Sequence, residues 1–259
     1  MTQAPPGSPP VLLVVAHGSR DPRHAATVSA LTARVRSLAP GLRVATGFLD
    51  FTLPRVERVL AGLHARGERD VVAVPLLLSR AFHARTDIPA VLAESAARLP
   101  GLIVRQAGVL GPSPVLTAAL ERRLAGAGVR GADRPETGVV LASAGSSDPR
   151  ALASITDLAR AWRRAAGWCA VRPAFASAAS PSTADAVRAL RADGVRQVVV
   201  ASYVIAPGRL PDRILADALR ARADVVAPVL GAAPELAGLL LRRYAEAARG
   251  RHRPALLTG

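Results

Sequence analysis

The sequence predicts an α/β protein made of two tandem, doubly wound parallel-sheet domains produced by an internal duplication. When the chain is aligned with itself without gaps, residues 16–23 fall on residues 143–150 and share Gly, Ser, Asp, Pro and Arg at the same places. Short apolar runs alternate with longer segments of helical periodicity, which is typical of βα units around a parallel sheet. The length of 259 residues suits two domains of ordinary size.

Four βα units are expected in the first half of the chain. Residues 11–16 form an unbroken apolar run and are predicted to be the first strand. Val28, Leu31 and Val35 recur at helical spacing and predict the helix that follows. The segment 70–77 is apolar on both faces, as expected for a strand inside a parallel sheet. The strands of this half are predicted at residues 11–16, 42–48, 70–77 and 102–109, and its helices at residues 24–38, 54–66, 87–98 and 114–125.

The same pattern starts again in the second half. Its strands are predicted at residues 138–142, 170–176, 195–203 and 224–229, and its helices at residues 149–164, 181–193, 210–222 and 234–248. Residues 126–137 contain three Gly and a Pro, so we expect the inter-domain linker there. The predicted domains are therefore 9–128, which would carry the active site, and 136–250.

The composition favours an acidic small molecule as the partner of this chain. The formal net charge is +15, and every one of the 34 basic residues is Arg. The planar guanidinium group of Arg binds carboxylates through two parallel hydrogen bonds. Nucleic-acid binding is not expected, because the arginines are dispersed and aromatic residues make up only 3% of the chain. Residues 1–10 lack the apolar run of a secretory signal, and no segment is apolar enough to span a bilayer, so we expect no membrane partner and a cytoplasmic location. The oligomeric state cannot be read from the sequence.

Three side chains able to bind a metal or move a proton are predicted at the carboxyl ends of neighbouring strands. His17 ends the first strand, Asp50 follows the second, and His83 lies just beyond the third. Ligands bind beyond these strand ends in open parallel sheets, so the three are expected to converge on one rim. Two imidazoles and a carboxylate suit a first-row divalent ion, and imidazoles also accept protons near neutral pH. The structural alternatives are a hydrogen-bonded histidine in a turn and an exposed or helix-capping aspartate.

The second copy keeps the turns of the first but lacks its candidate ligands. Ala144, Ser177 and Leu210 stand at the three corresponding positions. Asp21 and Asp148, each followed by Pro, are expected to cap the helices that begin there. The sequence therefore predicts one active site, in the first half.

The segment 78–89 combines His83 with two arginines and an aromatic residue, which suits a flat, acidic ligand. Asp87 either supports the His83 ring or caps the third helix, and we favour the structural role. Three further histidines lie in helical or tail contexts without convergent partners and are expected at the surface: His24, His64 and His252.

Signatures of several other enzyme classes are missing from the sequence. It contains no Gly-x-Ser-x-Gly elbow, no His-Glu-x-x-His, no P-loop and no Gly-x-Gly-x-x-Gly after the first strand. Hydrolase and nucleotide-dependent chemistries are therefore not favoured.

The motifs together resemble the sirohydrochlorin chelatases in their long, two-domain form. The resemblance rests on Ala-His-Gly-Ser-Arg at residues 16–20, Phe-Leu-Asp at 48–50, His-Ala-Arg-Thr-Asp-Ile-Pro at 83–89 and Leu-Gly-Pro at 110–112. It implies two chelatase-like, flavodoxin-like domains, with the histidine pair in the first. It also implies ATP-independent insertion of Fe²⁺ or Co²⁺ into sirohydrochlorin, an anionic tetrapyrrole, with release of two protons. The metal is then a substrate, and no nucleotide is needed.

The resemblance also implies roles for individual residues. His17 would be the proton acceptor and a metal ligand, and His83 the second metal ligand. The family usually has Glu at the position of Asp50, whose shorter side chain favours a water-mediated or substrate-facing role. The residues expected to contact the macrocycle are Leu78, Ser79, Arg80, Ala81 and Phe82, and those expected to steer its carboxylates are Arg20, Arg80 and Arg85.

Two alternatives remain open at this point. One is a non-catalytic carrier of metal or tetrapyrrole, against which the intact pair of His17 and His83 argues. The other is a related enzyme that acts on a less polar macrocycle such as protoporphyrin. The low aromatic content and the many arginines do not favour such an apolar substrate.

Overall fold

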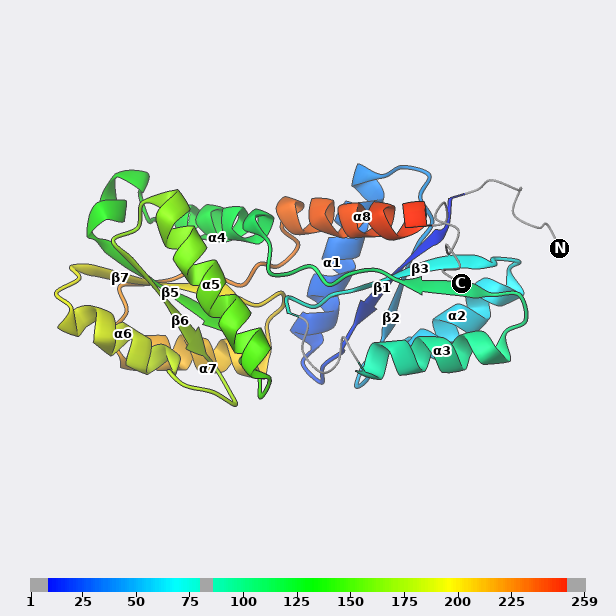
Figure 1. The fold of residues 1–259 in the computed structure, drawn as a ribbon, viewed down its shortest axis with the longest axis horizontal. Helices are drawn as coiled ribbons and strands as arrows, with labels where there is room; N and C mark the ends of the chain where they lie inside the picture. Colours follow the sequence, from blue (N-terminus) through cyan, green and yellow to red (C-terminus); the bar gives the residue numbers. More distant parts are fainter. Residues whose placement is uncertain (1–8, 80–85, 251–259) are drawn as a thin grey trace, which may run out of the picture.

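The computed structural model describes residues 9–79 and 86–250. It contains two four-stranded parallel sheets, each flanked by helices (Figure 1). The first sheet has the strand order β2-β1-β3-β4 and the second the order β6-β5-β7-β8. The strands are β1 Val11–Ala16, β2 Val44–Phe48, β3 Asp70–Pro75, β4 Ile103–Gln106, β5 Thr137–Ser143, β6 Ala170–Phe175, β7 Gln197–Tyr203 and β8 Val225–Val226. The predicted α/β fold with two duplicated parallel sheets is confirmed.

The helices follow the strands in the predicted alternation. They are α1 Pro22–Leu38, α2 Val56–Ala65, α3 Ile88–Arg98, α4 Pro114–Gly126, α5 Pro149–Ala166, α6 Thr183–Ala192, α7 Arg209–Arg220 and α8 Pro234–Arg249, with a short 3₁₀ helix, η2, at Gly131–Glu136. The largest departures from the predicted bounds are at the edge strands β4 and β8, which are shorter than expected. An edge strand has one hydrogen-bonding neighbour, so fewer of its residues are held in the ladder.

The first helix of each repeat begins with the same cap. Asp21 Oδ1 accepts a hydrogen bond from Arg23 N at 2.9 Å, and Asp148 Oδ1 accepts one from Arg150 N at 2.9 Å. A proline follows each aspartate at the first helical position, where its missing N–H costs nothing. The capping role predicted for Asp21 and Asp148 is confirmed.

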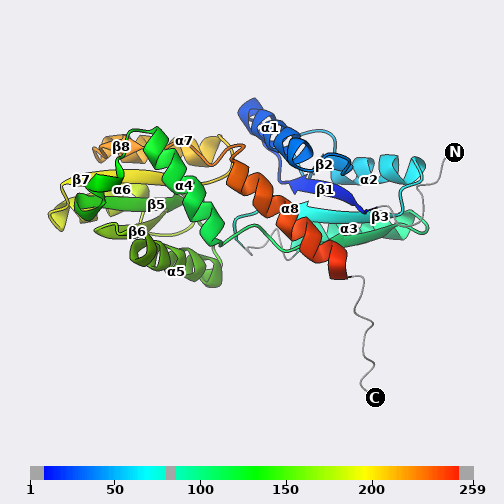
Figure 2. The same cartoon turned by 90° about the horizontal axis from the view of Figure 1, so that it is seen from above.

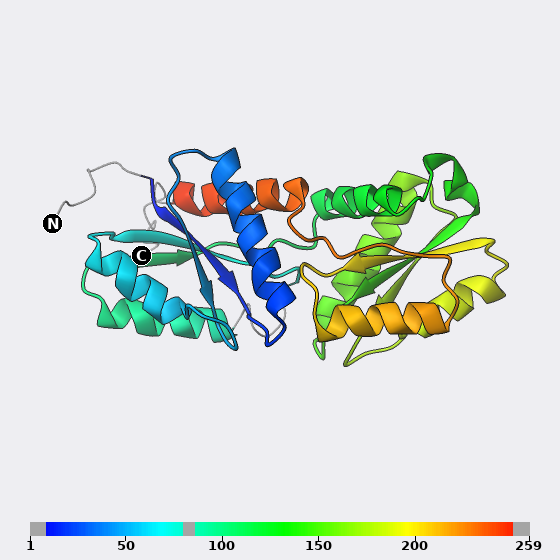
Figure 3. The ribbon, with the colours of Figure 1, turned by 180° about the vertical axis from the view of Figure 1, so that it is seen from behind.

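The last helix of each repeat packs on the sheet of the other repeat. Helix α4, from the first repeat, contacts β7 and α5, whereas α8, from the second, contacts α1 and β3 (Figure 2). Seen from behind, α8 at the red end of the chain lies on the blue and cyan half of the molecule (Figure 3). We call the first sheet with α1, α2, α3 and α8 the first lobe, and the second sheet with α4, α5, α6 and α7 the second lobe.

Polar contacts anchor α4 and α8, the two helices exchanged between the repeats. In α4, Glu121 Oε1 accepts hydrogen bonds from Trp162 Nε1 at 2.6 Å and Trp168 Nε1 at 2.8 Å. In α8, Tyr244 Oη donates to Pro10 O at 2.7 Å, immediately before β1. These bonds satisfy polar groups that would otherwise be buried without partners.

The chain passes between the lobes in the segments before α4 and before α8, so the predicted linker at 126–137 lies within the second lobe, where η2 contacts β5. The predicted boundaries 9–128 and 136–250 follow the repeat in the sequence and stay a prediction.

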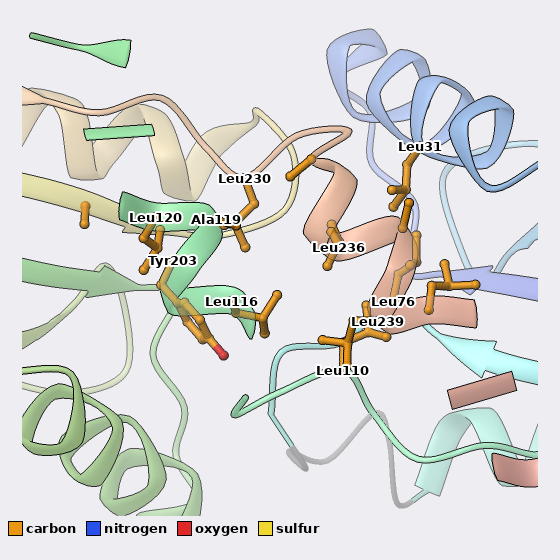
Figure 4. Close-up of a cluster of buried hydrophobic side chains, with 14 of the residues drawn as sticks. Leu31, Leu76, Leu110, Leu116, Ala119, Leu120, Tyr203, Leu230, Leu236 and Leu239 are labelled. Atoms are coloured by element: carbon orange, nitrogen blue, oxygen red, sulfur yellow. The ribbon is translucent and has the colours of Figure 1, made fainter. Parts of the chain in front are cut away.

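One hydrophobic cluster continues through both lobes, with Leu31 and Leu76 from the first and Leu120 and Tyr203 from the second (Figure 4). Within the described ranges, no helix has the length and hydropathy needed to cross a bilayer.

Candidate functional site

A cavity of about 1060 Å³ opens between the two lobes. Most of its lining residues lie at or just beyond the carboxyl ends of the central strands β1 and β3 of the first sheet and β5 and β7 of the second. This is where parallel α/β sheets bind their ligands. The candidate site is therefore built by both lobes, whereas the predicted ligands come from the first lobe alone.

His17 is half-buried on the cavity wall, directly after β1. The turn that carries it requires glycine at the next position. Gly18 has φ +93°, and a Cβ there would lie 1.7 Å from the Asp50 carbonyl oxygen. A backbone hydrogen bond from Asp50 N to His17 O, at 2.8 Å, ties the same two loops together. The loops after β1 and β2 are thus fixed against each other, and these contacts fix the backbone position of His17.

Asp50 is held by its own loop. Its Oδ1 accepts a hydrogen bond from Phe51 N at 2.8 Å and forms an ion pair with Arg55 Nη2 at 2.9 Å. The hydrogen bond from the Phe51 amide, together with the Arg55 guanidinium, lowers the pKa of the Asp50 carboxyl. Asp50 is not among the residues that line the cavity. Its predicted contact with substrate stays a prediction.

An aromatic and cationic cluster lies next to His17. The Arg20 guanidinium carbon is 5.2 Å from the centroid of the Phe51 ring, within the range of a cation–π contact. The His17 and Phe51 rings meet edge to face, with centroids 6.2 Å apart and an interplanar angle of 72°. All three side chains line the cavity. The sequence predicted site roles for His17 and Arg20 but not for Phe51. The available signal was that Phe51, like His17, is replaced by alanine in the second copy, at Ala178.

His24 lies on the cavity wall, so the prediction of a surface position is wrong. Helix α1 starts at the rim of the cavity, and of its first turn His24 lines the cavity, whereas Pro22 and Arg23 are exposed. The His24 ring is half-buried, 6.4 Å from the Phe48 ring, and its Nδ1 has no hydrogen-bond partner among the described residues. Burial, and then the nearby His17, lower the pKa of His24.

The other predicted site residues fall into two groups. Leu78 and Ser79, just beyond β3, are half-buried and line the cavity. The remaining ones lie outside the described residues: Arg80, Ala81, Phe82, His83 and Arg85. Asp87 directly precedes α3, but its side chain makes no capping hydrogen bond to that helix, so the capping role favoured for Asp87 is wrong. Among the described residues, no group of three His, Cys, Asp or Glu side chains could hold a metal.

The second lobe supplies a wall with different chemistry. Ala144 and Leu210 line the cavity, while Ser177 Oγ donates to the Ala144 carbonyl at 2.9 Å. Tyr203 stands where the first copy has Leu76, and its buried hydroxyl has no hydrogen-bond partner among the described residues. Burial raises the pKa of the Tyr203 hydroxyl, which therefore stays protonated and can act as a donor.

An ion pair connects the lobes at the edge of the cavity. Arg23 Nη2 lies 2.6 Å from Asp212 Oδ2, in the first turn of α7, and the same nitrogen is 2.6 Å from Asp21 Oδ2. Both aspartates line the cavity. Because the side chains of Arg23 and Asp212 are both about half exposed, their ion pair contributes little to stability.

Comparisons with known proteins agree on one family. The family model CbiX matches residues 11–127 and again residues 138–247, once for each repeat. The chain is 27% identical over 205 residues to the sirohydrochlorin cobaltochelatase of Priestia megaterium. The aligned region makes up 78% of this chain and 66% of that enzyme, just under two thirds of its length. It is 24% identical over 241 residues to the sirohydrochlorin ferrochelatase of Bacillus subtilis strain 168, covering 92% and 91% of the two chains.

Solved structures show the same architecture. SirB from Bacillus subtilis with Fe³⁺ superposes with a TM-score of 0.83 at 24% identity, covering 94% of this chain and 97% of that one. SirB from Bacillus subtilis subspecies spizizenii in complex with cobalt gives a TM-score of 0.78 at 23% identity, covering 93% and 96%. At these identities the structural likeness establishes the fold.

Proposed function

Because this chain belongs to the CbiX family, we propose that it inserts a divalent metal, Fe²⁺ or Co²⁺, into sirohydrochlorin. The observation that carries the proposal is the position of His17. It lies in a cavity of about 1060 Å³ between two lobes, next to Arg20, and the repeat without these side chains has Ala144 and Ser147 instead. The names of the relatives from Priestia megaterium and Bacillus subtilis point to the same substrate and to both metals.

The chemistry of insertion sets what the residues must do. A free macrocycle carries two protons on its inner nitrogens, and both leave when the metal enters. The reaction therefore needs a base and a way to present the ion, but no nucleotide. In this proposal the neutral imidazole of His17 accepts a proton and also presents the metal. His83 supplies the second metal-binding nitrogen.

Charge on the cavity wall complements the substrate. Arg20 is exposed at the wall and can pair with a peripheral carboxylate of the macrocycle. We assign Asp50 a role in shaping the loop, because its Oδ1 is already bonded to the Phe51 amide and the Arg55 guanidinium. Leu78 and Ser79 contact one edge of the bound ring in this arrangement.

Anaerobic absorption spectroscopy tests the proposal. The purified full-length protein is mixed with sirohydrochlorin and, in separate reactions, with Fe²⁺, Co²⁺ or Ni²⁺. We expect the metallated spectrum to form faster than in protein-free controls with Fe²⁺ or Co²⁺, and the ratio of the two rates defines the preferred metal. If none of the metals is inserted faster than in the controls while the macrocycle still binds tightly, the protein is a carrier and the proposal is wrong.

A further inference from the structure

Phe51 holds a bulky side chain in a backbone conformation that such residues rarely adopt. Its φ is +56°, in the left-handed region, and 49% of the residue is exposed. A non-glycine residue in this region costs energy and is found mainly where surrounding structure or function requires it. An exposed phenyl ring adds a second unfavourable feature, since it leaves apolar surface in water. Both features occur together on the wall of the cavity.

The fold needs this turn but not the phenyl ring. In the second repeat Ala178 occupies the corresponding position with φ +57°. The two copies also share the close approach of glycine to the next loop, Gly18 to the Asp50 carbonyl and Gly145 to the Ser177 carbonyl. Alanine therefore satisfies the backbone, and the large ring is present only in the copy that carries His17.

The surroundings of the ring are those of a binding surface. The Arg20 guanidinium lies 5.2 Å from the ring centroid, and the His17 ring meets it edge to face at 6.2 Å. The Arg20 guanidinium lies over the phenyl ring and so places a positive charge directly beside this apolar surface. The apolar ring, the cation and the candidate base together form one continuous part of the cavity wall.

We propose that Phe51 is the stacking surface that orients the flat, conjugated macrocycle over His17, while Arg20 beside it pairs with a peripheral carboxylate. This inference rests on the proposed function and deepens it by assigning a substrate-positioning side chain. Stacking on an aromatic ring suits a planar π-system with acidic substituents, because the face of the macrocycle meets the phenyl ring and its charged border meets the guanidinium.

Binding of metal-free sirohydrochlorin separates this role from metal insertion. The dissociation constant is measured by absorption or fluorescence titration, without metal, for wild type, Phe51→Ala, Phe51→Tyr and Leu53→Ala. Phe51→Ala introduces the residue that Ala178 shows to be compatible with the turn. Leu53 is the matched control, since it is an apolar residue of the same loop, 76% exposed, and does not line the cavity.

We expect Phe51→Ala to weaken binding about tenfold or more, as for the loss of other aromatic stacking contacts. Phe51→Tyr should bind within about twofold of wild type, and Leu53→Ala should bind like wild type. In the metallation assay, Phe51→Ala should raise KM more than it lowers kcat.

The other outcomes overturn the inference in distinguishable ways. If Phe51→Ala binds as tightly as wild type, the ring is not a stacking surface, although the proposed function stands. If Leu53→Ala weakens binding as much as Phe51→Ala, the effect belongs to the loop and not to the ring. If wild-type protein neither binds nor metallates sirohydrochlorin, the proposed function itself fails.

Discussion

Gly18 lies directly against the carbonyl oxygen of Asp50, so that a Cβ at Gly18 would be 1.7 Å from that oxygen. This contact joins the loops after β1 and β2, and it fixes the backbone on which His17 is carried. The second repeat has the same arrangement between Gly145 and Ser177, at 1.9 Å. The close approach is therefore a property of the duplicated fold, and the first repeat adds the chemical side chains to it.

Replacing Gly18 with alanine should separate these loops. The variant should lose more than about 2 kcal/mol in free energy of unfolding, because positive φ and a backbone clash both act against the side chain. Chemical denaturation of Gly18→Ala measures this loss. Gly41→Ala is the matched control, since Gly41 has φ +87° and a Cβ there would meet no atom of the described residues within 4 Å. Equal losses of unfolding free energy in the two variants would show that the close contact between Gly18 and the Asp50 carbonyl does not contribute to the effect.

The position of His24 makes the stability of the protein depend on pH. Burial lowers the pKa of His24 below the ordinary value near 6.5, so the unfolded chain takes up this proton more readily than the folded one. Stability should therefore fall as the pH drops below about 6.5, towards the lower folded pKa. In thermal melts, His24→Gln should lose less stability than wild type between pH 8 and pH 5.5. Identical pH profiles for the two proteins would contradict this assignment.

Glu121 should be required for α4 to stay on the second lobe. Its carboxylate accepts hydrogen bonds from the indole N–H groups of Trp162 and Trp168 and forms an ion pair with Arg134, and all three groups lose this partner when Glu121 is replaced. Glu121→Ala should therefore cost about 2–4 kcal/mol of unfolding free energy. Glu235→Gln, which removes a single ion pair with the partly exposed Arg122, should cost less than about 1 kcal/mol. A small loss in Glu121→Ala would mean that apolar packing alone holds the exchanged helix.

Restoring a single histidine to the second repeat should not create a second site. Ala144→His places an imidazole at the position equivalent to His17, but Ser177 and Leu210 supply no metal-binding partners there. The initial rate of metallation should stay within about twofold of wild type. A clear gain in rate, or a metal bound stably at the new histidine in an X-ray absorption spectrum, would show that the second lobe retains a latent site.

Much of the fold was predictable from the sequence because it depends on local signals. Apolar periodicity and the repeat predicted the alternation of strands and helices, and Asp21 and Asp148 were identified as caps from the proline that follows each. The exchange of α4 and α8 was not predictable. Both helices have apolar faces that either sheet could cover, and the choice depends on contacts distant in sequence, such as Glu121 with Trp162.

The candidate site was predictable to a lesser degree. His17 and Arg20 follow a strand and could be assigned to its carboxyl end, where the structure places them on the cavity wall. His24 was assigned to the surface because helical periodicity does not say which side of α1 meets a second lobe. Phe51 was missed because its significance depends on a positive φ and on contacts with Arg20 and His17. The role of His83 and the absence of nucleic-acid partners stay predictions.

The metallation rate of His17→Ala tests most directly whether His17 carries the reaction. Under anaerobic conditions, with saturating sirohydrochlorin and Fe²⁺ or Co²⁺, we expect the initial rate to fall by about 10²-fold or more, because both the base and a metal ligand are removed. The thermal melt and the dissociation constant for the metal-free macrocycle should stay close to those of wild type, which shows that fold and cavity are intact. A folded His17→Ala protein that metallates sirohydrochlorin at the wild-type rate would show that His17 is neither the proton acceptor nor a required metal ligand.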